Sequence, residues 1–124
     1  MIVEEIMQRE IHTLLPENTV RDAVRLMREE NIRHVPIVNK ENVVVGIITD
    51  HDVKNALPSR LREEPDSTIY DAPIEKIMVK NPIVGHPLDF VEEVAMTFYD
   101  AKISCLPIVT AGKLVGIVTT TDLL

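Results

Sequence analysis

The chain has 124 residues, a length that suits one compact body with a hydrophobic core. Its 13 Lys and Arg against 20 Asp and Glu give a net charge of −7, and only 3% of its residues are aromatic, so a basic or base-stacking surface for nucleic acid is not expected. No apolar run approaches the roughly 20 residues of a membrane span, and the N-terminus lacks the basic start of a signal peptide, so the sequence predicts a soluble cytoplasmic protein with no membrane partner.

The sequence contains one unit written twice. Residues 3–38 align with residues 74–109 at an offset of 71, which becomes 70 by Gly46 and Gly116 because the second copy has lost one residue in a turn. We expect the repeats to span residues 1–58 and 73–124, joined by a charged, proline-marked linker at 59–72 whose Ile69 and Tyr70 dock against the fold. Identical residues at matched positions include Ile6/Ile77, Met7/Met78, Pro16/Pro87, Val20/Val91, Pro36-Ile37-Val38/Pro107-Ile108-Val109, Thr49/Thr119 and Asp52/Asp122.

Each repeat is predicted to open with a short helical turn and then an extended piece that leads to a proline, because proline disfavours helix at the residue before it. The turns end at Ile6-Met7 and Ile77-Met78, the extended pieces lie near 11–14 and 83–85, and the prolines are Pro16 and Pro87.

An amphipathic helix follows in each repeat, with apolar residues at positions i, i+3, i+4 and i+7. These residues are Val20, Ala23, Val24 and Met27 in the first repeat and Val91, Val94, Ala95 and Phe98 in the second. The helix starts are indicated by Thr19-x-x-Asp22 and Asp89-x-x-Glu92, which have the pattern of a capping box.

A hairpin and a final helix complete each repeat. The strands at 35–38 and 106–109 contain a proline, which confines such a strand to an edge or to its first residues, and a polar turn leads to the strand that carries Gly46 or Gly116. The final helix of the first repeat is predicted from Asp50 to Leu57. The second copy stops at Leu124, so we expect its last helix to be truncated and the chain to be the N-terminal portion of a longer protein. The order β-α-β-β-α, written twice, predicts a mixed α/β (α+β) fold.

The second strand of each hairpin ends in Thr-x-x-Asp, at Thr49–Asp52 and at Thr119–Asp122. One interpretation is a capping box, in which the threonine side chain caps the following helix and the side chain of the acid three residues later accepts from the threonine N–H. The other is a site for a polar ligand, because a helix start favours phosphate and a carboxylate accepts from vicinal hydroxyls. The two roles are compatible for the threonine and compete for the aspartate, and both stay open at this point.

Taken together, two β-α-β-β-α units with hydrophobic-Pro-Ile-Val and Gly-hydrophobic-hydrophobic-Thr-x-x-Asp resemble a tandem pair of cystathionine-β-synthase (CBS) domains over essentially the whole chain. Within that family, the amino-acid sequence is most similar to the acetoin-utilisation (AcuB-type) proteins, in segments 1–7, 32–36, 56–59, 86–93 and 105–107. Those proteins usually continue into an ACT domain, which we expect to be absent here. The resemblance implies two repeats about a pseudo-twofold axis and a homodimer formed through helices.

The resemblance also implies two clefts for an adenosine-containing regulatory ligand such as AMP, ADP, ATP, NAD or S-adenosylmethionine, and no catalytic cofactor. In such pairs the aspartate of Thr-x-x-Asp holds the ribose, and the residues ahead of the Pro-Ile-Val of the opposite repeat enclose the adenine. Carried over by position, the first cleft comprises Asp122, Thr119, Met7, His12, Ile32, Arg33 and His34, and the second comprises Asp52, Thr49, Met78, Ile83, Ile103, Ser104 and Cys105.

Charge distinguishes the two predicted clefts. The first offers Arg33, His12 and His34 to a phosphate, whereas the second offers Ser104 and Cys105, with His51 as its nearby basic candidate. Because arginine matches phosphate geometry bidentately, we expect a phosphorylated ligand to prefer the Asp122 cleft.

Other chemistry is weakly indicated. The four histidines show no zinc-type spacing, so no metal site is predicted. Cys105 is the only cysteine and begins a strand, where a buried small hydrophobe is the commoner role, so no disulfide and no nucleophile are expected. Two functions remain: a non-catalytic regulatory module that senses an adenosyl compound, and a structural dimerisation module with empty clefts.

Overall fold

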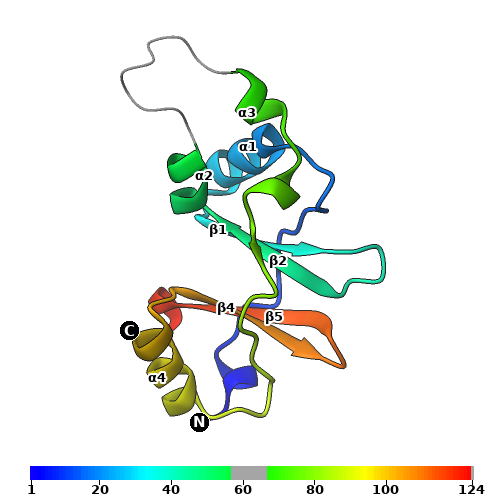
Figure 1. Ribbon diagram of the computed structural model, residues 1–124. Helices are drawn as coiled ribbons and strands as arrows, with labels where there is room; N and C mark the ends of the chain where they lie inside the picture. Colours follow the sequence, from blue (N-terminus) through cyan, green and yellow to red (C-terminus); the bar gives the residue numbers. More distant parts are fainter. Residues whose placement is uncertain (57–66, 124) are drawn as a thin grey trace. The chain divides into compact units, whose positions relative to one another are not determined.

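The computed structural model describes residues 1–56 and 67–123. In chain order its elements are η1 (Val3–Glu5), α1 (Val20–Glu30), β1 (His34–Val38), β2 (Val44–Thr49), α2 (Asp50–Ala56), α3 (Ser67–Asp71), η2 (Ile74–Lys76), β3 (Val79–Lys80), α4 (Val91–Ala101), β4 (Cys105–Thr110), β5 (Lys113–Thr119) and η3 (Thr120–Leu123) (Figure 1). The predicted mixed α/β class is confirmed. Most of the predicted linker, and the predicted helix end at Leu57, lie outside the described residues.

The chain forms two compact units. Unit 1 comprises Met1–His12, Glu41–Val44 and Ile83–Leu124, and unit 2 comprises Thr13–Lys40 and Val45–Pro82. Each unit therefore combines the hairpin strands of one repeat with the opening segment of the other repeat. The sequence repeat indicates the hairpins but not this exchange of opening segments.

Unit 2 is built on a sheet of order β1-β2-β3. β1, with its internal Pro36, lies at the edge as predicted. β2 and β3 are antiparallel, with Gly46 opposite Lys80 and Ile47 opposite Val79. The predicted extended piece before Pro16 is present as a parallel bridge between Leu14 and Ile37. Helix α1 contacts β1, α2 and α3. The buried core of this unit consists of Val20, Ala23, Met27, Val35, Ile37, Ile48, Val53 and Ile74.

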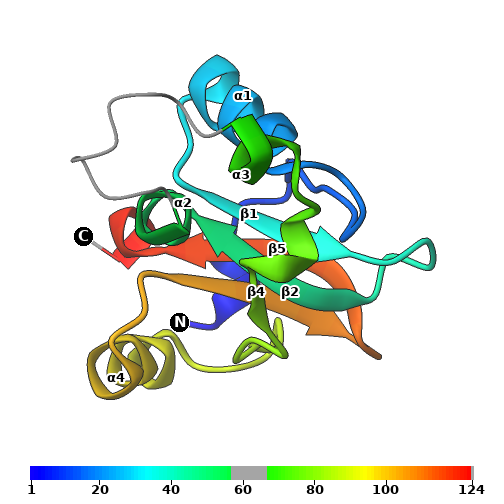
Figure 2. The ribbon, with the colours of Figure 1, turned by 45° about the horizontal axis from the view of Figure 1, so that its top comes forward.

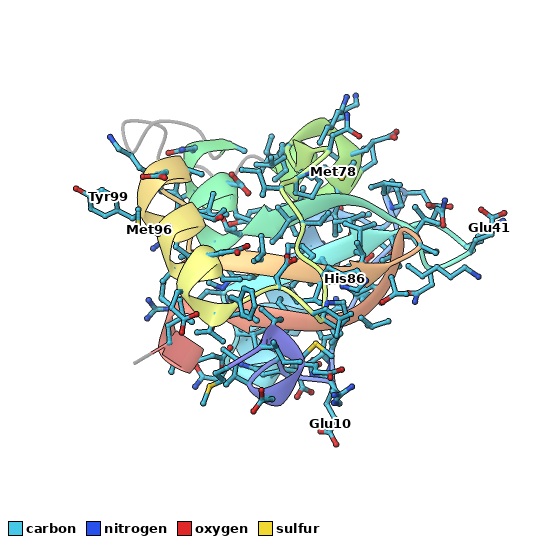
Figure 3. All side chains as sticks on the ribbon, turned by 90° about the horizontal axis from the view of Figure 1, so that it is seen from below. Glu10, Glu41, Met78, His86, Met96 and Tyr99 are labelled. Carbon is cyan, nitrogen blue, oxygen red and sulfur yellow. The ribbon has the colours of Figure 1, made fainter. Side chains whose placement is uncertain are left out.

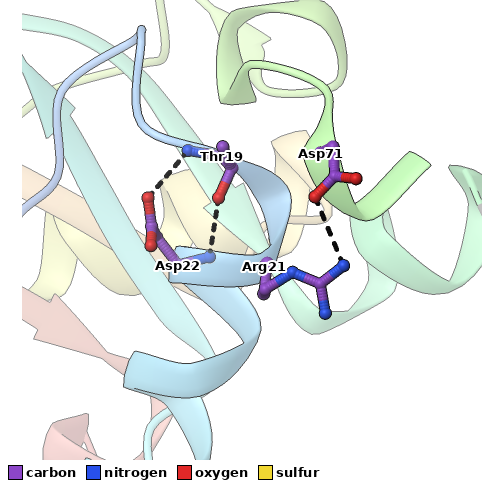
Figure 4. A network of polar contacts seen from close by, with 4 residues as sticks. All are labelled: Thr19, Arg21, Asp22 and Asp71. Atoms are coloured by element: carbon purple, nitrogen blue, oxygen red, sulfur yellow. Dashed lines mark hydrogen bonds and ion pairs between the residues drawn. The ribbon is translucent and has the colours of Figure 1, made fainter. Parts of the chain in front are cut away.

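Polar contacts fix the N-terminal end of α1 (Figure 4). Thr19 and Asp22 form the predicted capping box, in which each backbone N–H donates to the other side chain, over 2.9 and 3.2 Å. The guanidinium of Arg21 lies 3.3 Å from Asp71 and over the ring of Tyr70, so it links α1 to α3. Tyr70 packs against the core of unit 2, which confirms the predicted docking for this residue.

Unit 1 is built on the antiparallel hairpin of β4 and β5 (Figure 2). Leu106 lies opposite Val118 and Ile108 opposite Gly116, so the alternate residues of both strands face one core. The opening segment joins this unit through a bridge between Gln8 and Ile117. The buried core consists of Val3, Met7, Val94, Phe98, Leu106, Ile108 and Val118.

Two predictions about α4 are wrong. Its N-cap is Phe90, and the carboxylate of Asp89 accepts instead from the N–H of His86 over 2.9 Å, because the turn that contains Pro87 folds Asp89 back on the preceding residues. Ala95 is exposed, since Val94 and Phe98 face the core and a residue next to Val94 lies about 100° further round the helix.

Candidate ligand-binding turns

The Thr49–Asp52 turn joins strand β2 to helix α2 in unit 2. The N–H of Thr49 donates to Oδ2 of Asp52 over 2.9 Å, and the N–H of Asp52 donates to Oγ1 of Thr49 over 3.2 Å. The capping interpretation is therefore correct for this turn. It uses only one carboxylate oxygen, since Oδ1 of the half-buried Asp52 accepts no hydrogen bond from any described residue.

The Thr119–Asp122 turn joins strand β5 to the 3₁₀ turn η3 in unit 1. Oδ2 of Asp122 accepts from the N–H of Thr119 over 2.8 Å and from its hydroxyl over 3.3 Å. Here the threonine hydroxyl donates to the acid, whereas in the other turn it accepts from the backbone. In this cap only the carboxylate accepts, and both hydrogen bonds from Thr119 are made to Oδ2.

Gln8 reaches the carboxylate of Asp122 from the opening segment. Its side-chain Nε2 lies 3.0 Å from Oδ1 and 3.1 Å from Oδ2. Its backbone is paired with Ile117, N–H to carbonyl in both directions, over 2.9 and 3.0 Å. Sequence analysis missed Gln8, although a signal was present: at an offset of 71 the matching residue is Val79, so the two repeats differ immediately after the shared Ile-Met.

Met7 and Met78 occupy equivalent places in the two units. A Cβ added to Gly116 would overlap the side chain of Met7, and one added to Gly46 would overlap Met78. Each glycine therefore permits the methionine of the exchanged opening segment to cross the strand closely. Met7 is buried in the core of unit 1 and Met78 is half-buried against the core of unit 2, so both have a packing role.

The residues ahead of β1 lie beside the Asp52 turn in unit 2. The carbonyl of Arg33 accepts from the N–H of Asp50 over 3.0 Å. Burial lowers the pKa of the half-buried His34, an effect that Arg33 reinforces, while Asp50 and Asp52 act in the opposite direction. Ile32 packs against the core of this unit. His34 and the Asp52 carboxylate are therefore electrostatically coupled.

The residues ahead of β4 lie beside the Asp122 turn in unit 1. The carbonyl of Ser104 accepts from the N–H of Thr120 over 3.1 Å, and Cys105 is paired with Thr119. Burial, with a smaller contribution from the charge of Asp122, raises the pKa of the Cys105 thiol to about 12. The thiol is therefore protonated at neutral pH, as a packed side chain rather than a nucleophile.

The remaining predicted residues are more exposed. Ile83 is 49% exposed and His12 is also exposed, both in unit 1. Ile103 of the same unit is half-buried against its core. The predicted grouping of each Thr-x-x-Asp turn with residues of the opposite repeat draws on both units, and it stays a prediction. Within residues 1–56 and 67–123, no group of three or more His, Cys, Asp or Glu side chains could hold a metal ion, and no helix is long and apolar enough to cross a membrane.

Comparison with known proteins assigns the chain to a family. The family model for the CBS domain matches residues 3–59 and again residues 74–124. Homoserine O-acetyltransferase of Methanococcus vannielii is 35% identical over 114 residues, which are 92% of this chain and 22% of that enzyme. The chain thus spans about a fifth of that relative's length.

Solved structures are similar over nearly the whole chain. A putative acetoin utilization protein (AcuB) from Vibrio cholerae has 35% identity and a TM-score of 0.85, over 99% of this chain and 87% of the other. The CBS domain pair of protein MJ0100, in complex with 5′-methylthioadenosine and S-adenosyl-L-methionine, has 30% identity and a TM-score of 0.85, over 99% and 92%. CBSX2 in complex with AMP has 27% identity and a TM-score of 0.81, over 98% and 91%. With both repeats matched by the family model, the chain belongs to the CBS domain family and consists of one tandem CBS pair.

Proposed function

We propose that this CBS pair is a non-catalytic regulatory module that binds an adenosine-containing small molecule and passes the binding event to an attached or associated protein. The observation that carries the proposal is that the two oxygens of the Asp52 carboxylate differ in their hydrogen bonds. Oδ2 is held by the N–H of Thr49, and Oδ1 accepts no hydrogen bond from a described residue. A half-buried, oriented carboxylate oxygen is suited to accept from the hydroxyls of a ribose.

The ligand class is supported by the similar structures. The MJ0100 pair was solved with 5′-methylthioadenosine and S-adenosyl-L-methionine, and CBSX2 with AMP. These three ligands share an adenosine group and differ in what extends from its 5′ position. We therefore propose adenosine as the common recognition element here, with Asp52 and Asp122 as the ribose acceptors.

A phosphate on the ligand is proposed to contact Arg33. Arg33 is exposed, and its guanidinium makes no hydrogen bond or ion pair with the described residues, so it is available to an anion. Arginine binds phosphate bidentately. Because the chain has a net charge of −7, an anionic ligand has to be held by a local cation such as Arg33.

Calorimetric titration with adenosine, AMP and S-adenosylmethionine tests the proposal. Asp52→Asn and Asp122→Asn keep the shape of the side chain and remove its charge. A hydrogen bond from a hydroxyl to a charged carboxylate contributes on the order of 1.5–3 kcal/mol. Affinity at the altered turn should fall roughly tenfold to a hundredfold. The proposal fails if none of the three compounds binds the wild type below millimolar concentration.

The alternative is a structural dimerisation module with empty clefts, and one observation favours an interface. Met96 and Tyr99 project outward from α4 and are 57% and 80% exposed (Figure 3). We propose that the chain forms a homodimer that uses this face of α4. Light scattering should give a mass near twice the chain mass of 14.0 kDa. The double variant Met96→Lys, Tyr99→Lys should have the mass of one chain. A wild-type protein with the mass of one chain would contradict the proposed homodimer.

A further inference from the structure

The two Thr-x-x-Asp turns differ in what already occupies their carboxylates. At Asp122, the Nε2 of Gln8 lies within hydrogen-bonding distance of both oxygens, 3.0 Å from Oδ1 and 3.1 Å from Oδ2. At Asp52, the described residues leave Oδ1 without a hydrogen bond. The turns are therefore unequal in the unliganded chain, although their sequences share Thr-x-x-Asp.

The difference arises from one side chain at a matched position. Gln8 pairs with Ile117, and Val79 pairs with Ile47, the residue that matches Ile117 at an offset of 70. Both residues thus follow the methionine that crosses the strand glycine, in the same register. A glutamine at this place can donate to the carboxylate, and a valine cannot.

We propose that Gln8 is an internal competitor for the Asp122 carboxylate. Its amide occupies the two oxygens that would accept from the hydroxyl pair of a ribose, so Gln8 must swing away before such a ligand binds there. The inference rests on the proposed function. It has two consequences. Adenosine without a phosphate binds the Asp52 turn more tightly than the Asp122 turn. Binding at Asp122 releases the side chain of Gln8, which belongs to the opening segment Met1–His12.

The competition is tested in variants that retain one ribose-binding aspartate. In an Asp52→Asn background the Asp122 turn alone keeps its carboxylate, and Gln8→Val installs the residue that the second repeat has at this position, Val79. The dissociation constant for adenosine should fall roughly threefold to tenfold relative to Asp52→Asn alone, the range expected for removal of one competing hydrogen bond. The matched control reverses the exchange: Val79→Gln in an Asp122→Asn background should raise the dissociation constant by a similar factor. Val79 is 48% exposed, so the longer side chain has room.

A measurement without ligand tests the contact itself. Gln8→Val, Asp122→Asn and the pair form a double-mutant cycle, whose shifts in thermal unfolding should be non-additive because both changes remove the same contact. Additive shifts, or a dissociation constant for adenosine that Gln8→Val leaves unchanged or raises, would overturn the inference.

These outcomes are distinct from failure of the proposed function. If adenosine, AMP and S-adenosylmethionine all fail to bind the wild type and both single-aspartate variants, the function falls and the competition falls with it, even where the cycle shows coupling. If they bind and only the effect of Gln8→Val is missing, the proposed function stands and this inference alone is wrong.

Discussion

The N–H of Thr49 donates to Oδ2 of Asp52 over 2.9 Å, and the N–H of Asp52 donates to Oγ1 of Thr49 over 3.2 Å. Thr19 and Asp22 make the same two bonds, with the same lengths, at the start of α1. Asp22 follows no strand glycine and belongs to neither predicted cleft. The pair at α1 is thus a reference in which the cap is present and ligand binding is not proposed.

Asp52→Asn and Asp22→Asn should therefore destabilise the ligand-free protein by similar amounts. Each keeps an oxygen that can accept from the threonine N–H but loses the charge, at a cost on the order of 0.5–1.5 kcal/mol. Denaturant titration of both variants measures this. A much larger loss for Asp52→Asn would mean that its carboxylate is committed to the fold, which would weaken the case for a ligand at Oδ1.

Gly116→Ala should destabilise the protein because the new Cβ would overlap the side chain of Met7 and approach the carbonyl oxygen of Gln8 to 3.2 Å. Overpacking of this kind typically costs about 1–3 kcal/mol. Met7→Ala should partly rescue the variant, since it removes the overlapping atoms. Thermal unfolding of the two single variants and the pair would show this as non-additivity, and strictly additive losses would count against the close crossing of Met7 over β5.

Cys105 should be unreactive in the folded protein. With a thiol pKa of about 12, only about 1 in 10,000 of the Cys105 thiols is ionised at pH 8, and the side chain is only 6% exposed. Reaction with a thiol-specific chromogenic disulfide should be slow in buffer and fast in denaturant. Rapid stoichiometric labelling of the native protein would contradict the buried position of this residue at the start of β4.

His34 should make stability depend on pH near neutrality. Burial lowers its pKa in the folded chain below the ordinary value of 6.5, so the unfolded chain binds the proton more readily. Protonation then favours unfolding, and the free energy of unfolding should fall as the pH drops below about 6.5. Denaturant titrations between pH 7.5 and pH 5 should show a steeper loss for the wild type than for His34→Gln; equal slopes would contradict this.

Local patterns in the sequence predicted the parts of this fold that depend on neighbouring residues. The apolar spacing of residues 20–27 gave α1, and Thr19-x-x-Asp22 gave its cap, because both are settled within a few residues of one another. The cap predicted at Asp89 failed because a competing local contact, with His86, was stronger than the pattern. Ala95 failed because a small apolar residue fits an exposed helix position as well as a buried one.

Long-range relationships were the part that the sequence did not supply. The exchange of opening segments depends on contacts such as that between Gln8 and Asp122, which are 114 positions apart and leave no periodic signal. At the site, the capping role of Thr49 and Asp52 was one of two open interpretations. That Oδ1 of Asp52 accepts no hydrogen bond from the described residues could be recognised only from atomic positions.

The most direct test of the account is a calorimetric titration of adenosine into the wild type, Asp52→Asn and Asp22→Asn, three proteins that differ at one carboxylate each. We predict that Asp22→Asn binds at the Asp52 turn as the wild type does, and that Asp52→Asn loses roughly tenfold to a hundredfold in affinity there. At about 100 times its dissociation constant, adenosine should also stabilise the wild type by roughly 2.7 kcal/mol. Equal affinity in all three proteins, or no binding to any of them below millimolar adenosine, would contradict the claim that the carboxylate of Asp52 holds a ribose.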